Sequence, residues 1–160
     1  MSKKPCTAVV LSAGQGRRMG TSVQKQYIQL DGKEIICHTL ETFQQSSVID
    51  DIVLVVGKNQ EEYCQKELVE KYHFTKVQKI VVGGEERYHS VFNGLREITH
   101  QGYVFIHDGA RPFVSEEIMQ RAYDAVCRFG ACVVGMPVKD TVKIADKETF
   151  ISETPNRSFV

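Results

Sequence analysis

A glycine-rich segment followed by a lysine is the first group of residues in this chain whose types and spacing suit chemistry. Residues 12–20 read SAGQGRRMG, and Lys25 follows shortly after. Glycine lets backbone N–H groups approach a phosphate closely, while Arg18 and Lys25 add positive charge. The segment is neither a Walker A loop nor the dinucleotide fingerprint, because no GK pair follows and the third glycine comes one residue late. It predicts a site for the phosphates of a nucleotide, the alternative being a plain glycine turn with solvated basic side chains.

A second glycine turn follows a predicted strand and opens a predicted helix. Residues 83–90 read GGEERYHS. Adjacent glycines permit a close backbone approach, and Arg87 and Ser90 supply donors that a nucleotide accepts. Taken alone, the segment slightly favours a turn in which a glutamate caps the following helix.

An aspartate at the end of an apolar run is the third candidate. Residues 107–112 read HDGARP. Mg²⁺ prefers carboxylate oxygen and keeps substrate phosphates as further ligands, and arginine binds phosphate. Asp108 and Arg111 therefore predict a site for a metal and a phosphate. We expect His107 to be a core or supporting residue, because no Ser or Cys nucleophile adjoins it.

Polar residues near the C-terminus form a fourth, weaker pattern. Residues 140–143 read DTVK, and Thr154 and Arg157 follow. Alone, this pattern favours a turn that leads into a hairpin. It indicates a functional site only in combination with the other three motifs.

Strand-like and helix-like segments alternate along the chain. Short apolar runs predict strands, and apolar residues at helical spacing predict helices. The expected strands are residues 7–12, 51–56, 77–82, 103–107 and 131–135, and the expected helices are residues 35–43, 60–72, 87–98 and 116–128. Runs of four to six apolar residues fit strands that are buried on both faces, so we expect a mostly parallel sheet between helices, an α/β three-layer domain with right-handed crossovers. Ligands of such folds bind beyond the carboxyl ends of the strands, where all four motifs fall.

The C-terminal part departs from this alternation. Residues 141–145 and 149–152 predict two short strands around a polar turn. We expect this segment to form a β-hairpin or an extended arm.

The composition is that of a globular protein. The chain has 160 residues, 42% of them hydrophobic and 25% charged, which suits one domain and excludes a disordered chain or a coiled-coil rod. Basic and acidic residues both number 20, so we expect no general electrostatic binding to nucleic acid or to a membrane. Five scattered cysteines, no signal peptide and no apolar run near the ~20 residues of a membrane span predict a cytoplasmic protein.

Together the motifs resemble the 2-C-methyl-D-erythritol 4-phosphate cytidylyltransferase family of the non-mevalonate isoprenoid pathway. The matching text runs from SAGQGRRMG and KQY through HTLETF, VVGGEERYHSVFNGL and HDGARPFV to PVKDTVK and TPNR. The resemblance implies a Rossmann-like nucleotidyltransferase that transfers a cytidylyl group from CTP to 2-C-methyl-D-erythritol 4-phosphate. Pyrophosphate is released, and Mg²⁺ is the implied cofactor.

The resemblance also implies a role for each motif. Arg18 and Lys25 match the basic pair that stabilises the pentacovalent α-phosphate, and Asp108 matches a position close to Mg²⁺. The positions that match the CTP site are Ser12, Ala13, Gly14, Gln15, Gly16, Gly84, Glu85, Arg87, Ser90, Asp108 and Gly109. The positions that match the substrate side are Asp108, Arg111, Thr141 and Arg157. In this family the arm, here about residues 138–157, reaches across a homodimer, so that two subunits share each site.

Two departures from the family pattern bear on these expectations. The family usually reads Pro-Lys-Gln where this chain has Gln24-Lys25-Gln26, which is expected to loosen the approach of Lys25 while keeping its charge. The family also continues past the TxxR segment into a QTPQ block, a helical region and further active-site residues. We therefore expect residues 1–160 to form a single, incomplete nucleotidyltransferase domain that binds CTP weakly with little or no turnover.

Two other functions stay open at this point. D-ribitol 5-phosphate cytidylyltransferases, which make CDP-ribitol, have similar motifs, but the wording HDGARP and DTVK favours methylerythritol phosphate. A non-catalytic nucleotide-binding module would suit the short chain, although the retained basic and acidic residues oppose it. A Rossmann oxidoreductase fits poorly, because the glycine spacing differs and no ribose-binding acid is evident.

Overall fold

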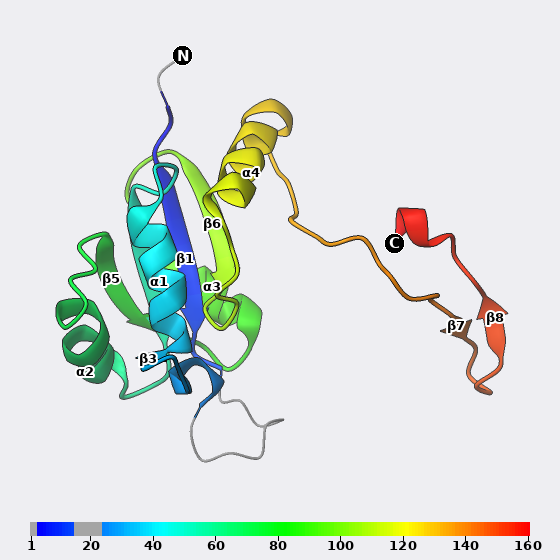
Figure 1. Cartoon of the computed structure of the whole chain (residues 1–160), viewed down its shortest axis with the longest axis horizontal. Coiled ribbons are helices and arrows are strands. Elements are labelled where there is room, and N and C mark those ends of the chain that lie inside the picture. The colour runs from blue at the N-terminus through cyan, green and yellow to red at the C-terminus, as the bar shows by residue number, and fades with distance from the viewer. Residues whose placement is uncertain (1–2, 15–23) are drawn as a thin grey trace.

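The computed structural model of the chain describes residues 3–14 and 24–160, and a four-stranded parallel sheet lies at its centre (Figure 1). The strands are β1 (Cys6–Ser12), β4 (Asp51–Val56), β5 (Val77–Val82) and β6 (Tyr103–Asp108). Their order across the sheet is β5-β4-β1-β6, and every neighbouring pair is parallel. The chain winds outward from β1 to β5 and then returns to the other side of β1. The winding direction therefore reverses between β1 and β6, which is where folds of this kind bind their ligands.

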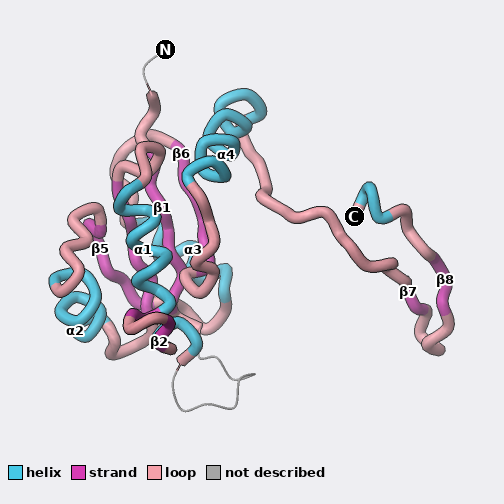
Figure 2. The backbone as a smooth tube through the Cα atoms, viewed as in Figure 1, coloured by secondary structure: helices cyan, strands magenta, loops and turns pink. Residues whose placement is uncertain are grey.

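Helices cover both faces of the sheet and give three layers (Figure 2). One face carries α1 (Ile35–Gln45), α4 (Glu116–Phe129) and a helical segment made of α2 (Glu61–Tyr63) and the π-helical residues Cys64–Glu70. The other face carries α3 (Arg87–Arg96), which packs on β1, β4 and β5. No helix among the described residues is long and apolar enough to cross a membrane. The α/β three-layer fold predicted from the sequence is confirmed.

The shorter elements lie at the ends of the larger ones. A 3-10 turn at Lys25–Tyr27 precedes a small antiparallel pair, β2 (Gln29–Leu30) and β3 (Lys33–Glu34). Near the C-terminus, β7 (Ile144–Ala145) and β8 (Ile151–Glu153) form an antiparallel hairpin, and a 3-10 turn follows at Arg157–Phe159. The predicted C-terminal hairpin is therefore present, with shorter strands than the sequence indicated.

The core follows from the alternation of side chains along β1. Cys6, Ala8 and Val10 point into the larger cluster beneath α1, where Phe43 and Leu40 are also buried. The next cluster, on the α3 face, contains Val9 together with Val53 and Val55 of β4. Both faces of β1 are thus buried, as the continuous apolar run predicts for a central parallel strand.

Local signals in the sequence define the ends of α4. Ser115 precedes the helix, and its hydroxyl accepts a hydrogen bond from the backbone N–H of Ile118 at 3.3 Å. Gly130 ends the helix in the left-handed conformation, with φ of 82°, which a residue with a Cβ adopts only with strain. The predicted bounds of 116–128 therefore agree closely with the structure.

The predicted strand at residues 131–135 is wrong. These residues lie extended after α4, and the chain leads away from the sheet (Figure 1). A strand forms only where a neighbour accepts and donates its backbone hydrogen bonds, and here β6 remains at the edge of the sheet. Val133 is consequently 97% exposed.

The expectation that every strand is buried on both faces is also wrong for β6. Its side chains alternate between half-buried and exposed, and Val104 and Ile106 are 38% and 45% exposed. They point to the face on which α3 packs mainly against β1, β4 and β5. An apolar run in the sequence therefore identified the strand but not its surroundings.

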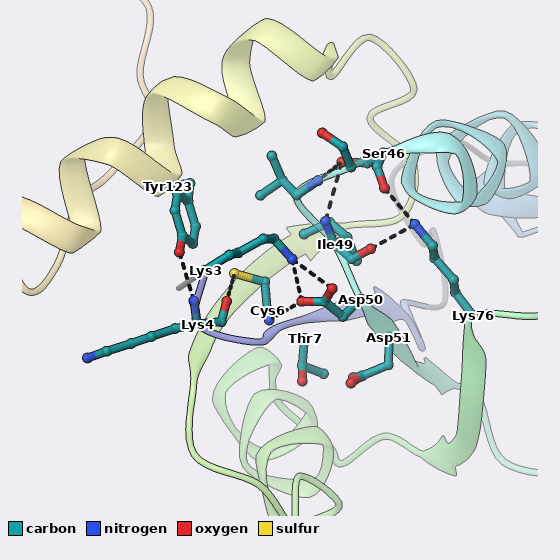
Figure 3. A network of polar contacts seen from close by, with 12 residues as sticks. Lys3, Lys4, Cys6, Thr7, Ser46, Ile49, Asp50, Asp51, Lys76 and Tyr123 are labelled. Atoms are coloured by element: carbon teal, nitrogen blue, oxygen red, sulfur yellow. Dashed lines mark hydrogen bonds and ion pairs between the residues drawn. The ribbon is translucent and has the colours of Figure 1, made fainter. Parts of the chain in front are cut away.

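A polar network holds the amino-terminal edge of the sheet together (Figure 3). The ammonium of Lys76 donates to the backbone carbonyl oxygens of Ser46 at 2.6 Å, Ile49 at 2.7 Å and Phe43 at 3.4 Å. Phe43 lies in the last turn of α1, so this cation neutralises carbonyls at the negative end of the helix. Partial burial opposes ionisation of Asp50, but hydrogen bonds from Lys3 and from the backbone N–H of Cys6 outweigh it and keep the pKa of Asp50 below its ordinary value.

The substitution Lys76→Met tests this network. It removes the donor while keeping an unbranched apolar stem, and it leaves the carbonyls without their charged partner. We expect the free energy of unfolding to fall by about 2 kcal/mol, the usual value for hydrogen bonds to a charged group. Urea denaturation followed by circular dichroism measures this change.

Lys79→Met is the matched control for this prediction, because Lys79 lies three positions further on and its side chain is exposed on β5. We expect the control to change stability by less than about 0.5 kcal/mol. Equal effects of the two substitutions would contradict the structural role of Lys76.

Candidate functional site

Backbone hydrogen bonds join the carboxyl ends of the four strands in two pairs. The N–H of Gly83, just after β5, donates to Val56 O at the end of β4, at 2.8 Å. The N–H of Gly109, just after β6, donates to Leu11 O of β1, also at 2.8 Å. The predicted glycine turn and the HDGARP segment are thereby fixed on either side of the residues that follow β1.

Close packing at Gly83 brings the first two motifs together. A Cβ on Gly83 would lie 2.4 Å from the Cβ of Ala13 and 2.7 Å from the hydroxyl oxygen of Ser90. No side chain fits there, so glycine is required for this approach. The residues after β1 and the first turn of α3 therefore share one wall at the carboxyl edge.

The second motif is held by the hydroxyl of Ser90, which is buried. It accepts a hydrogen bond from Gly84 N at 3.0 Å and lies 3.3 Å from Glu86 O, to which it donates. Both glycines of the turn are thus tied to the start of α3. The side chains of Glu85 and Arg87 are exposed beside this turn.

Asp108 lies between two arginines at the end of β6. Its Oδ1 accepts hydrogen bonds from Arg87, at 3.2 Å from Nε and 3.0 Å from Nη2, and its Oδ2 lies 3.1 Å from Nε of Arg111. The three side chains come from two separate motifs of the sequence, so the predicted convergence of these motifs is present. Because the two arginines are largely solvent-exposed and Asp108 is only half-buried, the ion pairs are weak and open to exchange with a phosphate.

The first motif is only partly within the described residues. Ser12 is buried at the end of β1, and its hydroxyl has no hydrogen-bond partner among the described residues. Ala13 and Gly14 follow it, whereas Gln15, Gly16 and Arg18 lie outside the described residues. Lys25 begins the 3-10 turn, and its side chain is exposed.

The donor set fits a magnesium ion only in company with a phosphate. Among residues 3–14 and 24–160, no three His, Cys, Asp or Glu side chains lie together in a way that holds a metal. Asp108 supplies a single carboxylate. Mg²⁺ in proteins is commonly bound by one or two carboxylates together with substrate phosphates and water, and Asp108 suits that role.

Two predicted substrate residues lie elsewhere in the chain. Thr141 and Arg157 belong to the extended C-terminal segment, which leads away from the sheet (Figure 1). Arg157 donates to Lys139 O at 3.1 Å, so it binds within its own arm. The structure of one chain therefore does not bring these two residues to the carboxyl edge.

His107 lies against the core in the structure, as its surroundings in the sequence predict. Its ring meets that of Phe43 edge to face, with centroids 5.0 Å apart, and its Nδ1 is buried without a hydrogen-bond partner among the described residues. Burial favours the neutral imidazole and lowers the pKa of His107, although the neighbouring Asp108 acts in the opposite sense. The imidazole thus faces the core rather than the predicted ligand site.

Three residues that shape the site were not predicted from the sequence. Thr39 of α1 donates to Gly109 O at 2.8 Å, and Gln26 and Tyr27 anchor the turn that contains Lys25. Gln26 and Tyr27 directly follow the predicted Lys25, and this position is the signal in the sequence that could have identified them. Nothing local distinguishes Thr39, because its partner is seventy positions away.

A cavity at the surface between β5 and α3 does not coincide with these residues. It is lined by Val81, Val82, Asn93, Arg96 and Glu97. None of these residues is among the site residues predicted from the four motifs. The candidate site is therefore identified by its convergent polar groups and not by a cavity.

Known proteins match the chain along almost its whole length. A family model for 2-C-methyl-D-erythritol 4-phosphate cytidylyltransferase matches residues 6–160. The enzyme of that name from Alkaliphilus metalliredigens is 45% identical over 152 residues, a match that covers 94% of this chain and 63% of the relative. The one from Clostridium botulinum is 47% identical over 152 residues, covering 95% of this chain and 67% of the relative.

Solved structures share the fold. The crystal structure of 4-diphosphocytidyl-2C-methyl-D-erythritol synthase from Anaerococcus prevotii has a TM-score of 0.83 at 34% identity, covering 98% of this chain and 66% of that one. The 2-C-methyl-D-erythritol 4-phosphate cytidylyltransferase of Francisella tularensis has a TM-score of 0.71 at 26% identity. This chain spans about two thirds of the length of these relatives.

The lowered pKa of His107 predicts a pH dependence of stability. Between the folded pKa and the unfolded value near 6.5, the unfolded chain binds more protons, so stability falls as the pH is lowered through this window. We expect His107→Phe to lose less stability than the unmodified protein between about pH 7.5 and about pH 5.5. Urea denaturation at several pH values measures the two slopes.

The control for this prediction is His73→Asn. His73 is exposed, and its backbone has φ of 55°, a conformation that asparagine tolerates. This variant should keep the pH slope of the unmodified protein. If His107→Phe keeps it as well, the burial of a neutral imidazole is not the cause.

Proposed function

We propose, because the chain belongs to the 2-C-methyl-D-erythritol 4-phosphate cytidylyltransferase family, that it supplies the nucleotide-binding part of an enzyme acting on CTP and 2-C-methyl-D-erythritol 4-phosphate. The observation that carries this proposal is the meeting of three motifs at one edge of the sheet, where Ala13 touches the Gly83 turn and Arg87 pairs with Asp108. Backbone N–H groups and arginine side chains are the donors that a triphosphate requires.

The proposed reaction is an in-line substitution at phosphorus. A phosphate oxygen of methylerythritol phosphate attacks the α-phosphorus of CTP, and the bond from that phosphorus to the bridging oxygen of the β-phosphate breaks. Pyrophosphate leaves with the bonding electron pair. The reaction needs little covalent catalysis by the protein, so positioning of the reactants and neutralisation of charge accelerate it.

The cationic side chains have separate tasks in this proposal. Arg18 and Lys25 neutralise the charge that develops at the α-phosphate, where preorganised positive charge is most effective. When the triphosphate binds, Arg87 exchanges Asp108 for a phosphate oxygen. The carboxylate of Asp108 would then be free to hold Mg²⁺, which would neutralise part of the charge of the phosphates.

Lys25 gives the sharpest test of this function. We propose a chimera in which residues 1–160 are followed by the portion of the Alkaliphilus metalliredigens relative that lies beyond the match. We expect the chimera to release pyrophosphate from CTP with methylerythritol phosphate, and Lys25→Met to lower kcat by about 10²–10³. A coupled pyrophosphate assay measures both rates.

Lys79→Met in the same chimera is the control and should keep the full rate. Calorimetric titration of the 160-residue chain with CTP and Mg²⁺ should give heat of binding, with little or no turnover by this chain alone. Turnover of D-ribitol 5-phosphate in place of methylerythritol phosphate, or an unchanged kcat in Lys25→Met, would overturn the proposal.

The arm is proposed to form a homodimer and to carry Thr141 and Arg157 to the partner's site. Three apolar side chains of the hairpin support this: Ile144, Phe150 and Ile151 are 45%, 70% and 63% exposed. Apolar surface of this kind on an extended segment is typical of an interaction site. In a dimer, Thr141 and Arg157 would contact a phosphate at the carboxyl edge of the partner's sheet, since they do not reach the carboxyl edge of their own chain.

Phe150→Asp tests the dimer. The substitution places a charge in the proposed apolar contact, so we expect the mass measured by light scattering to fall from that of a dimer to that of a monomer. Phe129→Asp is the matched control, because Phe129 is 69% exposed but lies at the end of α4, outside the arm. A monomeric mass for the unmodified chain would contradict the proposal.

We also propose that the enzyme works in the reducing cytoplasm. Cys6, Cys37 and Cys64 are free and buried, and burial raises the pKa of the Cys6 thiol to about 11 and of the Cys37 thiol to about 12. Thiols of this kind are protonated and unreactive at neutral pH. They serve the core as small apolar side chains, which suits a compartment that keeps cysteine reduced.

A further inference from the structure

The carboxamide of Gln26 holds one side of the turn that contains Lys25. Gln26 is buried, with only 4% of its surface exposed. Its Nε2 donates to the carbonyl oxygens of Ser12 at 2.8 Å and Gly14 at 3.0 Å, and it lies 2.7 Å from Oε1 of Gln24. These carbonyls lie where β1 ends and the glycine-rich segment begins. A single side chain therefore ties the lysine turn to the backbone of the first motif.

The hydroxyl of Tyr27 holds the opposite side of the same turn. It donates to Oε1 of Gln60 at 2.9 Å and lies 3.3 Å from the sulfur of Cys64. Its ring packs edge to face against Tyr63, with centroids 5.6 Å apart. Burial raises the pKa of Tyr27, so the hydroxyl stays a hydrogen-bond donor. The turn is thereby fixed to the segment that follows β4.

Lys25 directly precedes these two anchors in the turn, and its own side chain is exposed. The turn is closed by a backbone hydrogen bond from Tyr27 N to Gln24 O at 2.9 Å. A lysine has a long flexible stem, and its ammonium acts at a defined point only if the backbone beneath it is fixed. The contacts of the next two residues, Gln26 and Tyr27, provide that fixed backbone.

We propose that Gln26 and Tyr27 are positioning residues, which hold the turn so that Lys25 is presented to the nucleotide phosphates beside the end of β1. This rests on the proposed function, in which Lys25 neutralises charge at the α-phosphate. Gln26 suits the task because a primary amide has two N–H donors and can bind two carbonyls at once. A purely structural role for the pair predicts lost stability without an effect that depends on Lys25.

The first measurement concerns the anchoring alone and needs no ligand. Gln26→Met keeps the length of the side chain but removes the donors, and Tyr27→Phe keeps the ring but removes the hydroxyl. In either variant we expect amide hydrogen exchange at Tyr27 to speed up about tenfold, the factor that one hydrogen bond commonly provides. Exchange in β1 and β4 should change much less.

The matched control for both measurements lies at the other edge of the sheet. Ser46 is buried, and its hydroxyl accepts hydrogen bonds from the backbone N–H groups of Val48 and Ile49 (Figure 3). Ser46→Ala therefore removes a comparable buried polar anchor far from Lys25. It should lower the melting temperature but leave exchange at Tyr27 and CTP affinity unchanged.

The second measurement tests whether the anchors act through Lys25. Calorimetry with CTP and Mg²⁺ compares Gln26→Met, Lys25→Met and the double variant. We expect Gln26→Met to weaken CTP binding about tenfold, but by less than about twofold when Lys25 is already methionine, because coupled residues are not additive. Tyr27→Phe provides the same comparison with a smaller structural change, should Gln26→Met fail to fold.

The outcomes separate this proposal from the proposed function. No CTP binding by the unmodified chain would overturn the proposed function, and the positioning role with it, whatever the exchange rates. Normal CTP binding with additive losses in the double variant, or unchanged exchange at Tyr27, would overturn the positioning role alone. Non-additive losses together with faster exchange support it.

Discussion

The parallel pairing of β1 with β4 on one side and β6 on the other is the constraint on which the rest of this structure depends. Because all three strands run in one direction, their carboxyl ends reach the same edge of the sheet. The register aligns Ser12 with Val56 and Leu11 with Asp108, so the first and third motifs end at nearly the same level. The glycine turn after β5 then bonds back to Val56. Backbone hydrogen bonds of the sheet thus bring residues that are far apart in the sequence to the same edge.

The electrostatics of the site follow from this assembly and not from the total charge. The chain as a whole carries no net charge. At the carboxyl edge, however, Asp108 faces Arg87 and Arg111, and Lys25 follows the first motif. Local charge of this kind acts within about one Debye length, roughly 8–10 Å at physiological salt. A neutral protein can therefore present a cationic site to a phosphate without attracting nucleic acid in general.

The amount that the sequence could predict differs between elements for physical reasons. Runs such as DIVLVV at 51–56 identify central strands, because burial on both faces leaves a continuous apolar signal. Residues 131–135 carry the same signal but form no strand, since a strand also needs a neighbour and periodicity says nothing of neighbours. The motifs after β1, β5 and β6 meet at one edge because the carboxyl ends of parallel strands point the same way. The hydrogen bonds of Gln26 could not be predicted from the sequence, because they depend on where the chain folds back against the end of β1.

The residue before Lys25 shows how one restraint can replace another. Proline, expected at this position from the family resemblance, fixes φ near −65° through its ring. Gln24 has φ of −66° and ψ of 140°, so the backbone adopts the conformation that proline would impose. Its side-chain oxygen lies 2.7 Å from Nε2 of Gln26, the same nitrogen that binds Ser12 and Gly14. Proline acts partly by limiting the unfolded chain, whereas this hydrogen bond acts only in the folded one. In place of the proline ring, the hydrogen bond between the side chains of Gln24 and Gln26 provides part of the restraint on the backbone before Lys25. The buried amide of Gln26 is therefore more important in this chain than it would be after a proline.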